Sequence, residues 1–109
     1  MIIFRSDAGA DVMMFDDVAL RMLETIGKKG GERGVITVEE LLSVTAALRS
    51  AAAADKIQQQ KQAEEDRPLT EVSASGSLRP YVSFYQRAVP LIELFERSMK
   101  RGKPVFWGR

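Results

Sequence analysis

The sequence contains no cysteine and no histidine. The lack of cysteine excludes disulfide bonds, thiolate nucleophiles and cysteine-ligated metal sites. The lack of histidine removes the side chain that titrates near neutral pH without perturbation, and with it the commonest metal ligand. Catalysis would need a carboxylate or a lysine with a strongly shifted pKa. We therefore expect no enzyme activity, no cofactor and no metal site, and keep an enzyme with carboxylate or lysine chemistry as an alternative.

Long apolar runs and a charge excess of one sign are also missing. No apolar run approaches the ~20 residues that cross a bilayer, and Arg5 and Asp7 bring charge too early for a signal peptide. The 16 basic and 15 acidic residues give a net charge of +1, so no overall field attracts nucleic acid or membrane. We expect a cytoplasmic protein without a membrane partner, and its 109 residues predict a single domain over positions 1–109.

Apolar residues recur every seven positions in the last third of the chain. They are Leu78, Tyr85, Ile92 and Met99. This spacing lines one side of an α-helix, for which Ser77 is the expected cap, with Pro80 in the first turn. Gly102 ends the helix, and residues 105–107 read as a short strand.

The first fifteen residues predict a β-hairpin, because two short apolar runs, 1–4 and 12–15, flank turn chemistry. Residues 105–107 would add a third strand to this hairpin. The expected fold is therefore α+β, in the order ββαααβ, with a small antiparallel sheet packed against three helices.

The other two helices lie between the hairpin and the final third. The first is expected over residues 17–26, with Phe15 on its apolar stripe. The second begins at a capping box, Thr37 with Glu40, and loses its apolar face beyond Ile57. The glycine-rich stretch 27–34 predicts a solvated connector before a short extended piece at 35–36, and residues 69–76 predict a polar connection.

Two groups of charged residues are candidate binding sites. Arg5 and Asp11 face each other across the hairpin and predict an ion pair, with an anion site as the alternative. A basic cluster near the C-terminus accompanies Trp107. Its members are Arg97, Lys100, Arg101, Lys103 and Arg109. It is able to hold a phosphate backbone beside a stacked base, whereas the structural alternative pairs the cations with the helix dipole and buries the tryptophan.

With all helices on one side, the other side of the sheet would be left open. Ile3, Met13 and either Phe106 or Trp107 would lie there. An open apolar face on a small domain usually meets a partner. The leading hypothesis is a protein-interaction or scaffold module, homodimeric through the sheet or the helix pair. The other alternative is a nucleic-acid accessory protein that uses the basic cluster.

Three stretches of the sequence resemble one known family. They are FRSDAGADVMMF near the start, GVIT before the second helix, and RAVPLIELFERSMKRGKPVFWG at the end. With the spacing of Pro90, Gly102 and Trp107, they resemble the domain-of-unknown-function family 1840 over essentially the whole chain. The resemblance implies a short bacterial protein without assigned activity, and it brings no catalytic residues.

Overall fold

Four antiparallel strands form the principal sheet of the protein. The structure is a computed structural model that describes residues 1–29, 31–62 and 64–109. The strands are β1 (Ile2–Ser6), β2 (Gly9–Met14), β3 (Gly34–Ile36) and β6 (Val105–Gly108), in the spatial order β2-β1-β6-β3. The final strand therefore lies in the middle of the sheet, between the first strand and a short strand from the connector.

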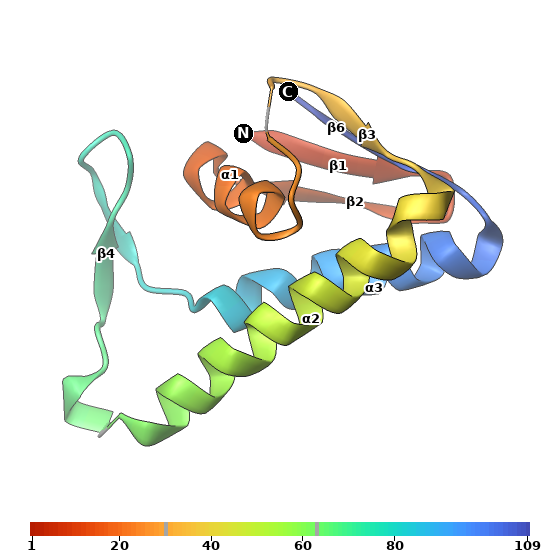
Figure 1. The fold of residues 1–109 in the computed structure, drawn as a ribbon. Helices are drawn as coiled ribbons and strands as arrows, with labels where there is room; N and C mark the ends of the chain where they lie inside the picture. Colours follow the sequence, from red (N-terminus) through yellow and green to blue (C-terminus); the bar gives the residue numbers. More distant parts are fainter. Residues whose placement is uncertain (30, 63) are drawn as a thin grey trace.

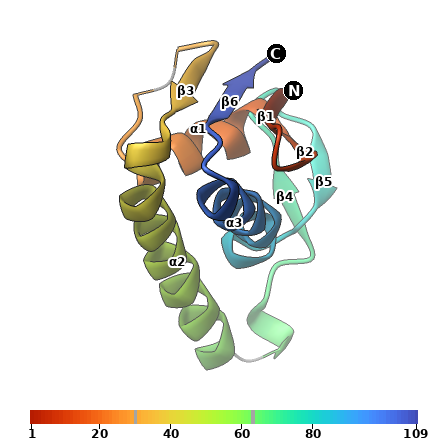
Figure 2. The same cartoon turned by 90° about the vertical axis from the view of Figure 1, so that its right-hand side faces the viewer.

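Three helices lie on one side of this sheet (Figures 1 and 2). They are α1 (Asp16–Thr25), α2 (Val38–Lys61) and α3 (Phe84–Arg101), and α2 and α3 run alongside each other (Figure 2). The predicted fold class, a small antiparallel sheet packed against three helices, is confirmed. The count of strands was too low, because β3 joins the principal sheet and two further strands form a separate hairpin.

The helix-facing side of the sheet forms the centre of the core. Phe4, Ile36 and Val105 are fully buried there, and Trp107 is 6% exposed. Trp107 lies opposite Phe4 of β1 and opposite Gly34 of β3. The expected pairing between the first residues and the tryptophan-bearing strand is thus confirmed.

Position 34 has room only for glycine, because the Trp107 ring occupies the space that a side chain would need. A Cβ atom added to Gly34 would lie 2.2 Å from Cζ2 of the Trp107 ring. The indole Nε1 donates a hydrogen bond to the carbonyl of Gly31 at 3.4 Å. Two residues of the predicted solvated connector therefore contact the tryptophan: Gly34 as the first residue of β3, and Gly31 through its carbonyl.

Capping fixes where the long helices begin. Glu40 accepts a hydrogen bond from the Thr37 backbone N–H at 3.0 Å, as the predicted capping box requires. The Lys28 ammonium, 2.5 Å away, and the Thr37 amide lower the pKa of Glu40 to about 2. At α3, Ser83 accepts from the Gln86 N–H and Gln86 bonds back to the Ser83 N–H.

Residues 69–80 differ most from the expectation. They form a hairpin of β4 (Thr70–Val72) and β5 (Leu78–Pro80), so the predicted polar connection and the predicted helix start at Ser77 are wrong. Val72 lies opposite Leu78, and Gly76 adopts a φ of 86° in the turn. The second helix ends at Lys61, earlier than its polar extension suggested, and position 63 is outside the described residues.

This β4–β5 hairpin stands beside α1 at one end of the molecule (Figure 1). Leu69, Val72 and Leu78 are 88%, 64% and 72% exposed. None of residues 69–80, all of which the structure describes, belongs to the buried core. The hairpin is therefore not attached by burial of apolar side chains.

Charged groups attach the hairpin instead. Arg79 of β5 donates two hydrogen bonds to Asp17 of α1, at 2.8 and 3.2 Å, and one to Glu71 of β4 at 2.6 Å. Its guanidinium lies 4.6 Å from the centre of the Phe15 ring, so Phe15 covers the ion pair rather than joining the helix stripe. The Arg79 side chain is 13% exposed, which shields these charges from solvent and salt.

Both carboxylates of this ionic clamp, defined as Asp17, Glu71 and Arg79, are stabilised as anions. Arg79 holds the pKa of Asp17 below its ordinary value. Partial burial raises the pKa of Glu71, but Arg79 and the Val82 N–H outweigh burial and leave this pKa lowered. The clamp is thus complete above the pKa values of the unfolded carboxylates, ~4, and is lost as the pH falls through the lowered values.

We predict that Gly34→Ala destabilises the fold by about 1–3 kcal/mol, because the Trp107 ring must move out of a packed site. Urea unfolding measures the change. Gly31→Ala is the control, since its Cβ would meet nothing nearer than 3.7 Å, and we expect a change under about 0.5 kcal/mol. Equal stability of the Gly34 variant and the wild type would contradict the packing described here.

We predict that Arg79→Gln releases the hairpin while the core stays folded. Amide hydrogen exchange of residues 70–80 should become faster by about tenfold or more, with core amides unchanged. In the wild type the same segment should be released progressively as the pH falls from about 4 through the lowered pKa values of Asp17 and Glu71. Arg49→Gln is the control, because Arg49 pairs with Glu96 elsewhere on the surface. An unchanged hairpin in Arg79→Gln would refute the ionic attachment.

Candidate interaction surface

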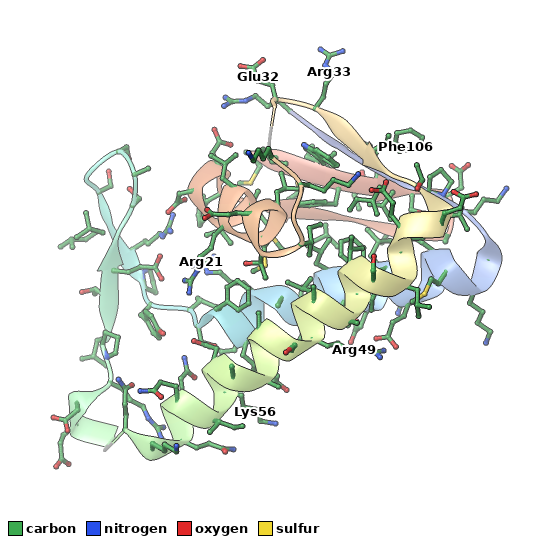
Figure 3. The ribbon with its side chains drawn as sticks, viewed as in Figure 1. Arg21, Glu32, Arg33, Arg49, Lys56 and Phe106 are labelled. Atoms are coloured by element: carbon green, nitrogen blue, oxygen red, sulfur yellow. The ribbon has the colours of Figure 1, made fainter. Side chains whose placement is uncertain are left out.

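The side of the sheet that faces away from the helices carries exposed apolar side chains. We call Ile3, Met13, Val35 and Phe106 the outer sheet surface. Ile3 lies opposite Met13, and Phe106 lies opposite Val35. Met13 and Phe106 are 66% and 53% exposed. Because side chains alternate along each strand, these four share one face, and Figure 3 shows Phe106 directed away from the helices.

The expected open face is therefore present, with Phe106 as its aromatic residue. The alternation of β6 decides this, since Val105 and Trp107 point to the core and Phe106 points outward. Val35 was not predicted for this surface. The available signal was that Val35 and Ile36 are consecutive β-branched residues, which favour a strand. A short strand is able to join a sheet at an edge that is still unpaired.

Charged side chains of both signs border the outer sheet surface. Nε of Arg5 lies 3.7 Å from Oδ2 of Asp11, and both side chains are about half exposed; this is the predicted ion pair. Arg5 lies opposite Phe106 across the β1–β6 pair. Glu32 and Arg33 extend from the segment before β3 (Figure 3). Both signs of charge therefore lie beside and between the apolar side chains of the outer sheet surface.

A hollow of about 570 Å³ lies in this border. It forms beside Gly108, whose outward position carries no side chain, and a Cβ added there would meet Cβ of Arg33 at 3.4 Å. Arg5, Phe106 and Arg109 line it as well. The outer sheet surface is therefore contoured, with an aromatic ring beside a depression.

The basic residues near the C-terminus do not gather around Trp107. Lys100, Arg101 and Lys103 are exposed where α3 ends, and Arg97 lies against the turn at Gly9. Arg109 lies at the other end of β6 and pairs with Asp16, with 2.9 Å between Nη2 and Oδ2. The structure places the tryptophan in the core, away from the end of α3.

One family model matches most of this chain. The sequence model of DUF1840, a domain of unknown function, matches residues 1–107. The chain belongs to the DUF1840 family. The matched range includes β1 and all of β6 except its last residue, Gly108. The DUF1840 match therefore covers the two paired strands that come from the beginning and the end of the chain. Neither the curated proteins nor the solved structures gave a match.

Two further properties of this DUF1840 chain concern membranes and metal ions. Among the helices in residues 1–29, 31–62 and 64–109, none is long and apolar enough to span a membrane. In the same ranges, no three acidic side chains converge as metal ligands would.

We predict that the fluorescence of Trp107, the single tryptophan, is that of a ring shielded from solvent. Its emission should be blue-shifted relative to the urea-unfolded chain, and iodide should quench it weakly, because the ring is 6% exposed. Adding a single-stranded oligonucleotide should leave the spectrum unchanged. Strong quenching in the folded protein would show that the ring is accessible for stacking.

Proposed function

We propose that this DUF1840 protein is a non-catalytic, cytoplasmic interaction module that forms a homodimer through its outer sheet surface. The observation that carries the proposal is the exposure of Met13 on β2 and Phe106 on β6, which share one uncovered face of the sheet with Ile3 of the intervening strand β1. Single exposed apolar residues are ordinary, whereas a contiguous group on one face marks a contact site.

The charges around this surface favour a second copy of the chain over nucleic acid. A two-fold interface brings each patch against itself, so it needs positive and negative groups together. Arg5 and Arg33 with Asp11 and Glu32 supply both signs. A nucleic-acid surface instead needs a predominance of positive charge.

The helix pair is the weaker dimer surface. Its exposed large apolar residues include Leu42 and Ile57, which are 72% and 53% exposed. Fifteen residues separate them, which places them about 22 Å apart along α2. They therefore do not form a continuous patch of the kind found on the sheet.

The carboxylates support a role without catalysis. A carboxylate general acid or base at neutral pH needs a raised pKa. Arg79 holds the pKa of Asp17 low, and Lys28 with Thr37 lowers that of Glu40 to about 2. Both shifts are in the opposite direction, and both groups are already engaged as partners of cations.

We predict a solution mass of two 12.1-kDa chains by light scattering at about 10–100 μM, where a complex of micromolar Kd is populated. Phe106→Asp and Met13→Asp should each give the mass of one chain, because each places a charge inside the apolar part of the interface. Leu42→Asp is the matched control on α2 and should remain dimeric. Circular dichroism confirms that each variant is folded.

A single-chain mass for the wild type over this range would refute the homodimer. Fluorescence anisotropy with a single-stranded oligonucleotide at two salt concentrations tests the nucleic-acid alternative. Tight binding that weakens as salt increases, and that is lost on substituting Lys100 and Arg101, would replace the proposal.

A further inference from the structure

A polar cavity of about 330 Å³ lies where the β4–β5 hairpin meets α1 and the beginning of α3. This volume is at the lower end of the range for small-molecule sites. Three arginines and three carboxylates line it. They are Arg21, Arg79, Arg87, Asp17, Asp55 and Glu71. None of its lining residues belongs to the outer sheet surface, so a ligand bound here would not compete with a second copy of the chain for the same residues.

The carboxylates of this cavity already have partners. Both oxygens of Asp17 accept from Arg79. Glu71 accepts from Arg79 and from the Val82 N–H at 3.2 Å. Asp55 of α2 accepts from the Tyr85 N–H at 3.0 Å, in the first turn of α3. A cation in the cavity would have to displace these donors.

The arginines have more capacity left. Arg21 lies with its guanidinium 4.7 Å from the centre of the Phe84 ring, and Figure 3 shows it extending from α1 towards the beginning of α3. Among the described residues, no carboxylate lies within ion-pair distance of it. Arg87 reaches Glu71 only at 3.5 Å and uses Nε on the Val82 carbonyl. Within the described ranges, the hydrogen bonds of its guanidinium use Nε and Nη2 and leave Nη1 for a ligand.

We infer that this cavity binds a compact anion through one carboxylate or phosphate group, held by Arg21 and Arg87. Two guanidinium groups provide the planar donor geometry that such oxygens match. The positive end of the α3 dipole lies at the same place, since Phe84 is its first residue, and adds a favourable field. The Phe84 ring holds Arg21 in place before the anion arrives, which lowers the cost of ordering that side chain.

Titration of the full chain at low ionic strength with inorganic phosphate, and separately with succinate, tests this site. Amide shifts in ¹H–¹⁵N spectra should saturate and should concentrate at residues 82–87 and around Arg21. Saturation with phosphate assigns a phosphate group, and saturation with succinate assigns a carboxylate group. Sodium chloride at the same ionic strength should give no saturating shift.

Variants separate a built site from general attraction to positive charge. Arg21→Gln, at an exposed position of α1 that leaves the hairpin contacts intact, should weaken binding about tenfold or more, because a charge-assisted hydrogen bond is lost. Arg87→Gln should do the same. Arg49→Gln, an arginine on α2 outside the cavity, should bind as the wild type does. No saturation with either anion, or equal weakening in Arg21→Gln and Arg49→Gln, would overturn the inference.

Discussion

The packing of Trp107 between Phe4 and Gly34 is the contact on which the rest of the structure depends. It sets the register of the last strand against both of its neighbours and places Val105 in the core. The same register determines that Phe106 faces outward. The buried Trp107 thus decides which side chains of β6 form the surface.

Much of this arrangement was predictable from local patterns. The opening hairpin, the capping box at Thr37 and the strand at 105–107 follow from period-two alternation and capping chemistry. The role of Gly34 was not predictable, because it arises from a ring 73 positions further along the chain. Nothing in the glycine-rich stretch alone distinguishes a solvated connector from a strand pressed against an indole.

The second hairpin escaped prediction for a different physical reason. Leu78 continues the seven-residue spacing of the last helix, and that spacing outweighed the turn signal of Ser75 and Gly76. The cavity residues were equally hidden, because Arg79 and Asp17 meet only through tertiary structure. The open face could be foreseen because a strand has two sides, whereas a cavity depends on where separate elements meet.

The β4–β5 hairpin is attached at its base, and its tip, residues 73–77, contributes no side chain to the buried core. The serines of this turn bond mainly to one another, as in the 2.9 Å contact between the hydroxyl oxygens of Ser73 and Ser75. Added or deleted residues there change neither a buried contact nor a strand of the principal sheet. Related chains therefore have room to lengthen this arm freely, and a reporter peptide inserted at the tip would be carried without disturbing the globule beneath it.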